Sequence, residues 1–401
     1  MFATLALVSI LGSPADDPKP PLPKPNETPS ATKFPKVIGW PKDKMPSAPP
    51  GFRVSVFADG LDNPRWLYVL PNGDVLVAES RTPDKGKKGA NRITLLRDAD
   101  KDGAAELKEV FAKDLNLPHG MALVGETFFV GNTDAILSYP YKADQTAVEG
   151  KGRKILDLPA GGYNNHWTRN LLPSRDGKKL LVSVGSGSNV AEHGTANEIL
   201  RANILEINLD GTGLRVFAGG LRNPVGMAFE PKSGVLWTAV NERDQLGDDL
   251  VPDYITGVQD GGFYGWPYSY MGQNEDPRRK GERPDLVAKA KMPDVPLGSH
   301  TASLGLAFYD AKAFPEKFRG GAFIGQRGSW NRSKFAGYRV VFVPFQDGKP
   351  SGPTEDFLTG FIANDDEVYG RPVGVAVATD GSLLVVDEPA NRIWRIAPET
   401  K

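Results

Sequence analysis

The sequence predicts an all-β protein folded as a six-bladed β-propeller over residues 51–398, with an insertion on one end face and a disordered proline-rich linker before it. From residue 51 onward, short runs of β-branched and aromatic residues are cut by turn dipeptides, with hardly any helical periodicity. A six-residue signature also recurs six times, and several copies visibly lead into a turn and a second strand. Sheets that cannot bury both faces alone are expected to stack around a central axis.

The signature consists of a small residue or proline, two variable positions and then an apolar alternation. Its copies begin at Pro64, Pro118, Thr168, Pro224, Ser303 and Pro372. The longest gap, between the fourth and fifth copies, contains an insertion between about Asp248 and Asp294 that is rich in glycine, proline and aromatic residues. Propeller insertions lie on an end face, where ligands bind.

Tight hairpins are predicted after three of these copies. Asn72-Gly73, Asp176-Gly177 and Asp380-Gly381 each precede an apolar run, and such dipeptides supply the positive φ angles that tight hairpins need. A two-sheet sandwich is the rival fold, but six similar copies in succession favour the propeller.

Two segments precede the propeller. Residues 1–15 contain the apolar run Leu5–Leu11, which is too short to span a bilayer and is typical of an export signal, with a frayed apolar N-terminus as the alternative. We therefore expect a periplasmic or secreted protein. Residues 16–50 hold many of the 34 prolines mixed with lysine and aspartate, a composition typical of a disordered linker.

Charge and cysteine content exclude several classes of protein. The 48 Lys+Arg nearly balance the 49 Asp+Glu, so no basic excess favours nucleic acid or an anionic membrane as partner. The chain has no cysteine, which excludes disulfides, thiolate nucleophiles, Cys-ligated zinc and iron–sulfur clusters. Any metal must therefore be bound by oxygen atoms or histidine.

An acidic loop carries the clearest local motif. Asp98, Asp100 and Asp102 alternate, Gly103 permits a sharp turn, and Glu106 stands at the ninth position. This pattern is typical of a loop that wraps oxygen ligands around Ca²⁺. Because the flanking segments read as strands, the sequence predicts a structural Ca²⁺ site on a hairpin, with a solvated acidic turn as the alternative.

Polar and cationic residues stand where the predicted innermost strands begin. His119 and His166 occupy this position in the second and third copies, and Arg222 and Arg371 occupy it in the fourth and sixth. Such side chains would converge in a positively charged axial pocket that suits an anionic ligand. Alternatively, the arginines cap strand ends or pair with nearby acids. No histidine pair has metal-ligand spacing, and no dinucleotide, Walker or Gly-x-Ser-x-Gly motif is present.

Five segments together resemble the glucose/sorbosone dehydrogenase family, most closely its sorbosone dehydrogenase branch. They are residues 164–170 (NNHWTRN), 220–224 (GLRNP), 241–248 (NERDQLGD), 261–267 (GGFYGWP) and 369–374 (YGRPVG). The resemblance implies a soluble six-bladed quinoprotein that uses pyrroloquinoline quinone (PQQ) and Ca²⁺. It further implies oxidation of a sugar hemiacetal or aldehyde by hydride transfer to the quinone C5, followed by an external electron acceptor such as a quinone, cytochrome or dye.

The resemblance assigns the following catalytic roles. His166 matches the general base that takes the hydroxyl proton, and Arg222 matches the arginine beside the C5 oxygen, where negative charge develops. Asn223 follows as a cofactor contact. His119 stands where related glucose dehydrogenases place an amide side chain against the cofactor, so we expect it at the same site.

The resemblance also implies cofactor and metal ligands. Arg327 and Arg371 match cationic residues that bind the cofactor carboxylates. The active-site Ca²⁺ would be held by the cofactor and by two consecutive backbone carbonyls, at about Glu242 and Arg243, although the Gly-Pro usual at that point is absent.

Two other functions remain open at this stage. One is a calcium-dependent propeller lactonase, which would favour carboxylates and asparagines at the strand starts where this chain has histidine and arginine. The other is a propeller without catalytic activity that binds a partner or glycan, because a fold alone does not determine function.

Overall fold

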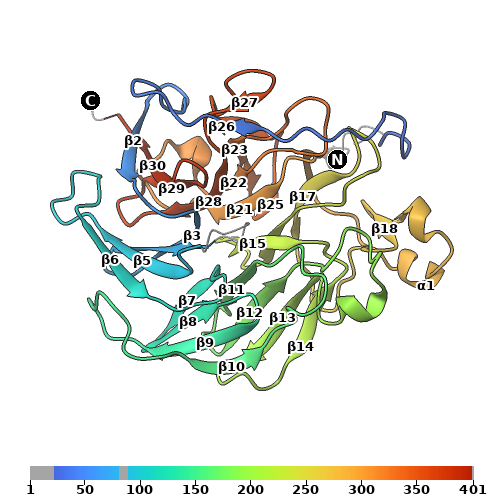
Figure 1. The fold of residues 1–401 in the computed structure, drawn as a ribbon, viewed down its shortest axis with the longest axis horizontal. Helices are drawn as coiled ribbons and strands as arrows, with labels where there is room; N and C mark the ends of the chain where they lie inside the picture. Colours follow the sequence, from blue (N-terminus) through green and yellow to red (C-terminus); the bar gives the residue numbers. More distant parts are fainter. Residues whose placement is uncertain (1–21, 81–88, 400–401) are drawn as a thin grey trace, which may run out of the picture.

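Six four-stranded antiparallel sheets form a ring around a common centre (Figure 1). The computed structural model describes residues 22–80 and 89–399. The predicted all-β, six-bladed propeller is confirmed. The predicted export segment, residues 1–15, lies outside the described residues.

Each blade runs outward from an innermost strand. Blade 1 comprises β3 (Pro64–Val69), β4 (Val75–Glu79), β5 (Arg92–Arg97) and β6 (Leu107–Ala112). Blade 2 comprises β7 (Met121–Val124), β8 (Thr127–Gly131), β9 (Ala135–Pro140) and β10 (Arg153–Asp157). Blade 3 comprises β11 (Arg169–Pro173), β12 (Lys179–Val184), β13 (Asn203–Asn208) and β14 (Arg215–Gly219).

The remaining blades follow the same order. Blade 4 comprises β15 (Pro224–Phe229), β16 (Leu236–Val240), β17 (Pro252–Gly257) and β20 (Val295–Ser299). Blade 5 comprises β21 (Ser303–Phe308), β22 (Ala322–Gln326), β23 (Arg339–Val343) and β26 (Glu355–Leu358). Blade 6 comprises β28 (Pro372–Val377), β29 (Leu383–Asp387), β30 (Arg392–Pro398) and β2 (Phe52–Ala58).

The ring is closed by strands from both ends of the chain. Strand β2 pairs antiparallel with β30 and so completes blade 6. The six innermost strands, each within or overlapping one copy of the signature, contact one another in the cyclic order β3, β7, β11, β15, β21, β28 and back to β3. The six copies of the signature therefore form the inner strands that surround the central axis of the propeller.

Glycine within the signature permits the close approach of these strands. A Cβ atom on Gly120 would lie 2.4 Å from the backbone nitrogen of Leu171, and one on Gly305 would lie 2.2 Å from the carbonyl oxygen of Val373. No larger residue fits at either position without moving the neighbouring blade.

The hydrophobic cores lie between adjacent sheets. Strand β29 is buried along its whole length, because both faces of a blade are covered by its neighbours. Its Leu384 and Val386 pack in one cluster with Val75 and Val77 of blade 1. The predicted hairpin turns are present, and Gly73, Gly177 and Gly381 all have positive φ.

The insertion projects from one side of the ring (Figure 1). It occupies residues 258–294, between β17 and β20, and is shorter than predicted because β17 takes up the beginning of the expected range. It contains β18 (Ser269–Tyr270), β19 (Asn274–Glu275), the 3-10 turn η2 (Pro277–Arg279) and α1 (Pro284–Val287). The other short elements are η1 (Thr195–Glu198), η3 (Glu316–Phe318), β24 (Phe345–Gln346) and β25 (Lys349–Pro350).

Residues 22–50, hereafter the strap, lie ordered against the propeller, so the prediction of a disordered linker is wrong for this part of the chain. Strand β1 (Lys36–Val37) pairs in parallel with β27 (Glu367–Val368). The Trp40 ring packs edge-on against Trp394, and its Nε1 donates to Asp387 at 2.6 Å. Overall composition predicted disorder, but a few aromatic side chains and main-chain bonds dock the segment. Within the described ranges, no helix is long and apolar enough to cross a membrane.

Candidate active site

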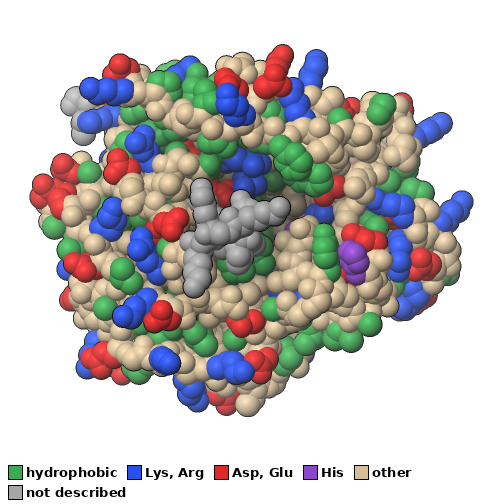
Figure 2. Space-filling model, in the orientation of Figure 1, with side chains coloured by type: hydrophobic (Ala, Val, Ile, Leu, Met, Phe, Trp, Pro, Cys, Tyr) green, Lys and Arg blue, Asp and Glu red, His purple; other side chains and the backbone are tan. Residues whose placement is uncertain are grey.

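A cavity of about 400 Å³ lies where the innermost strands begin. In an antiparallel blade, the start of the first strand and the end of the second lie at the same edge, so two sets of loops converge there. Among the lining residues are Arg65, His166, Asn223, Asp244 and Arg327. Figure 2 shows a face of the ring that is hollowed near its centre, with Lys and Arg side chains at the margin.

His166 is held in one orientation by the loop that follows β12. Its Nδ1 lies 2.8 Å from the carbonyl oxygen of Ser186 and 2.9 Å from the Ser186 hydroxyl, which itself donates to the Ser188 carbonyl. A carbonyl oxygen can only accept, so Nδ1 carries the hydrogen and Nε2 has a free lone pair. The loop approaches this closely because Gly185 has no side chain: a Cβ there would lie 2.6 Å from the His166 Cβ.

The imidazole of His166 is neutral at neutral pH. Burial lowers its pKa to about 3, and the positive charge of Arg222 acts in the same direction. A neutral imidazole with a free Nε2 is the form that a general base requires before reaction.

Arg222 is buried and does not line the cavity; it holds the loop that follows β16 in place. Its Nη2 pairs with an Asp244 carboxylate oxygen at 3.0 Å. Its Nη1 donates to the carbonyl oxygens of Asn241 and Glu242, at 3.2 and 2.6 Å. Of the two expectations for Arg222, a cation of the pocket or a partner of a nearby acid, the ion pair with Asp244 matches the second.

A cluster of three arginines and one glutamate supplies the positive charge of the cavity. Arg65 and Arg327 line the cavity and both pair with Glu388, the Arg65 pair at 2.5 Å. Arg371 lies behind them, where its Nε and Nη2 donate to the carbonyls of Arg327 and Gly328. Burial, followed by repulsion from Arg327, lowers the pKa of Arg371 to about 9. The cluster retains a net positive charge, as predicted for the pocket.

Asn223 and His119 lie at different depths from the cavity. Asn223 lines the cavity, and its Oδ1 is buried without a hydrogen-bond partner among the described residues. His119 is fully buried behind the lining, with its ring centroid 4.7 Å from that of Trp66, and neither ring nitrogen has a partner within residues 22–80 and 89–399. Burial lowers the pKa of His119 well below its usual range. Asn223 can therefore meet a ligand directly, whereas His119 lies one layer deeper.

The side chains of Glu242 and Arg243 point away from the cavity. They pair with each other at 2.9 Å, and Arg243 also reaches Asp276 of the insertion at 3.1 Å, so this pair anchors the insertion to blade 4. The oxygen-bearing side chains that do line the cavity here are Asn241 and Asp244. The assignment of Ca²⁺ to the backbone carbonyls of residues 242 and 243 stays a prediction.

Sequence reasoning missed several contributors to the site, among them Arg65, Asn241, Asp244 and His300. Arg65 follows Pro64 in the first copy of the signature, so the argument used for the other strand starts would have found it. Asn241 and Asp244 lie within a segment that carried the resemblance. His300 lies just before β21, with Nε2 2.8 Å from the Gly247 carbonyl and Nδ1 3.5 Å from Asp244.

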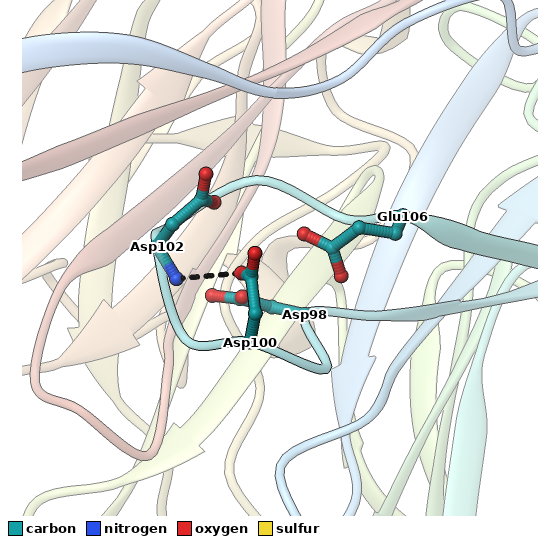
Figure 3. A group of neighbouring side chains, drawn as sticks. All are labelled: Asp98, Asp100, Asp102 and Glu106. Carbon is teal, nitrogen blue, oxygen red and sulfur yellow. Dashed lines mark hydrogen bonds between the residues drawn. The ribbon is translucent and has the colours of Figure 1, made fainter.

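The acidic loop lies between β5 and β6 and does not line the cavity. Carboxylate oxygens of Asp98, Asp100, Asp102 and Glu106 all lie within 4.8 Å of one another (Figure 3). Loop N–H groups are bound by these same carboxylates, for example Gly103 to Asp98 at 3.0 Å. The geometry is compatible with the predicted Ca²⁺ site, which stays a prediction.

The cavity fits a planar anionic cofactor. Arg65 and Arg327 offer cations, Asn223 contributes an amide side chain to the lining, and Trp167 and Val225 contribute aromatic and apolar walls. Fold and site together define a six-bladed propeller of the quinoprotein dehydrogenase type.

The chain belongs to the TrAA12-like family, whose family model matches residues 46–253 and 274–399. It is 27% identical to the aldose sugar dehydrogenase YliI of Escherichia coli, over 88% of this chain and 94% of that protein. It is 26% identical to a pyrroloquinoline quinone-dependent pyranose dehydrogenase of Coprinopsis cinerea, over 84% of this chain. The match spans about half, 52%, of the fungal protein.

Solved structures agree on the fold. The holo form of the PQQ domain of the Coprinopsis cinerea pyranose dehydrogenase superposes with a TM-score of 0.73 at 22% identity, covering 91% of this chain and 100% of that chain. A calcium structure of a Trichoderma reesei enzyme of family AA12 gives a TM-score of 0.74 at 21% identity, covering 91% and 98%. The predicted membership in a family of PQQ-dependent sugar dehydrogenases is confirmed, whereas the sorbosone branch stays a prediction.

Proposed function

We propose that this chain is a quinoprotein that oxidises the hemiacetal or aldehyde group of a sugar, of the aldose or sorbosone type, with PQQ and Ca²⁺ as cofactors. One observation carries the proposal: the cavity presents a neutral histidine with a free Nε2 beside a cationic cluster. Membership in the TrAA12-like family supports the same reaction class.

The arginine cluster would bind and orient the cofactor. Arg65 and Arg327 would bind the cofactor carboxylates, and Arg371 would hold the backbone of the Arg327 loop in place. A charge-assisted contact of this kind contributes roughly 1.5–3 kcal/mol. When bound, the quinone supplies a hydride acceptor at its C5 carbon, and Ca²⁺ polarises the carbonyl there.

His166 would act as the general base. Its Nε2 accepts the proton of the sugar hydroxyl, while the hydrogen bond from Nδ1 to Ser186 keeps the ring oriented. Arg222 and Asn223 lie in the loop between β14 and β15. Arg222 fixes the Asn241 and Glu242 carbonyls and Asp244, and Asn223 would contact the ligand from the cavity wall. His119 would support the cavity wall from behind through Trp167, whose ring it meets edge-on.

We further propose that residues 51–398 form the dehydrogenase domain, with the strap as part of its working structure. Residues 1–15 would direct export to the periplasm or beyond the cell, where an external acceptor reoxidises the enzyme. The acidic loop would bind a structural Ca²⁺ ion.

Reconstitution tests the proposal. Purified protein would be incubated with PQQ and Ca²⁺ without an electron acceptor, and D-glucose or another aldose would be added while the quinone absorbance is followed. Loss of the oxidised-quinone band on addition of sugar is the expected result. Lactone hydrolysis without PQQ would support a lactonase instead, and retention of sugar without either reaction would support a binding module.

A further inference from the structure

An aromatic pair forms part of the rim of the central cavity. Phe34 of the strap and Trp330, in the loop after β22, stack with ring centroids 5.5 Å apart and planes inclined by 5°. Both residues line the cavity, yet Phe34 is 72% exposed. The pair therefore presents an apolar face to solvent directly over the site.

The backbone on both sides of Phe34 is fixed. The N–H of Lys33 donates to the Trp330 carbonyl at 2.7 Å, and Asn331 Nδ2 donates to the Ala31 carbonyl at 2.7 Å. Strand β1 begins two residues after Phe34 and pairs with β27. The aromatic face is thus held by the fold before any ligand arrives, which reduces the entropy lost on binding.

Residues 22–45 of the strap, which include Phe34, lie outside the family match, which begins at residue 46. Phe34 adds a wall that the matched region does not supply. A wall added at the rim can change which ligand binds without changing the chemistry at His166.

We propose that Phe34 and Trp330 form a stacking subsite for a second pyranose ring, so that the enzyme binds reducing disaccharides with one ring at His166 and the next on Phe34. The inference rests on the proposed sugar oxidation. The C–H face of a pyranose is apolar and suits an exposed aromatic ring, while its hydroxyls remain hydrated or meet polar neighbours such as Asn165, which lines the same cavity. Phe34 is then a specificity-determining residue.

Substitution of Phe34 tests this subsite in the reconstituted enzyme. Phe34→Ala should raise both KM and the dissociation constant for cellobiose by about 3- to 10-fold, a typical contribution of one aromatic contact. The kcat value and all constants for glucose should stay near those of the wild type. Phe34→Tyr should restore cellobiose binding. Met45→Ala is the matched control, because Met45 is 51% exposed on the same strap but does not line the cavity.

Equilibrium binding measured by tryptophan fluorescence separates this inference from the proposed function. If cellobiose binds in a Phe34-dependent way but no sugar is oxidised, the subsite stands and the proposed function fails. If glucose is oxidised but Phe34→Ala affects both sugars equally or not at all, the subsite is overturned and the proposed function survives. If neither sugar binds nor reacts, both are overturned.

Discussion

Replacing His166 with asparagine should make the fold less sensitive to acid. The folded pKa of about 3 lies below the ordinary value of 6.5, so the unfolded chain takes up the proton first as the pH falls. The stability that depends on neutral His166 is fully present above about pH 6.5 and is lost as the pH falls toward 3. The substituted asparagine cannot titrate in this range, yet its amide can still donate to Ser186.

The size of the effect follows from the two pKa values. Between pH 7 and pH 5, proton uptake by the unfolded state lowers the free energy of unfolding by about 2 kcal/mol through this one residue. Other titrating groups are common to both proteins and cancel when the wild type is compared with His166→Asn.

Urea unfolding at pH 7 and pH 5 measures this difference. The wild type should lose about 2 kcal/mol more than His166→Asn over this interval. His193→Asn makes the same exchange at an exposed position and serves as the matched control for the substitution itself. Equal losses for the wild type and His166→Asn would show that His166 is not held neutral, which would refute the argument for its role as a base.

Three other perturbations follow from the structure. Asp100→Asn should abolish a rise in melting temperature that Ca²⁺ produces in the wild type; no such rise in the wild type would identify the loop as an acidic turn. Arg327→Ala should weaken PQQ binding by about 10- to 100-fold in an absorbance titration, and unchanged affinity would place the carboxylates elsewhere. Gly305→Ala should cost roughly 1–3 kcal/mol in urea unfolding, whereas Gly161→Ala, with nothing within 4 Å of its new Cβ, should cost far less; equal effects would contradict the close approach of β21 and β28.

The propeller could be predicted because its repeating information is local. Each innermost strand carries the same apolar alternation, and the glycines that let β21 approach β28 recur at the same place in the signature. Of the residues expected at the strand starts, His166 lines the cavity, whereas His119, Arg222 and Arg371 do not; Asn223, which does line it, was expected only from the family resemblance.

The remaining features depend on contacts between distant segments. For Arg222 the sequence left open whether it is a cation of the pocket or pairs with a nearby acid, and the ion pair with Asp244 forms only once the loop after β16 folds back over it. The strap was expected to be disordered because prolines dominate its composition, yet Trp40 and strand β1 dock it against blade 6. Neither contact leaves a pattern at a fixed spacing in the sequence.

Single-turnover reduction of bound PQQ by an aldose, compared between the wild type and His166→Asn, tests the central claim most directly. Both proteins would be loaded with PQQ and Ca²⁺, with cofactor occupancy confirmed by absorbance before sugar is added. We predict rapid reduction in the wild type and a rate lower by about 10²- to 10⁴-fold in His166→Asn, the range typical for loss of a positioned base. Equal rates in the two proteins at equal occupancy would contradict the assignment of His166 as the base, and no reduction in a fully loaded wild type would contradict the proposed sugar oxidation itself.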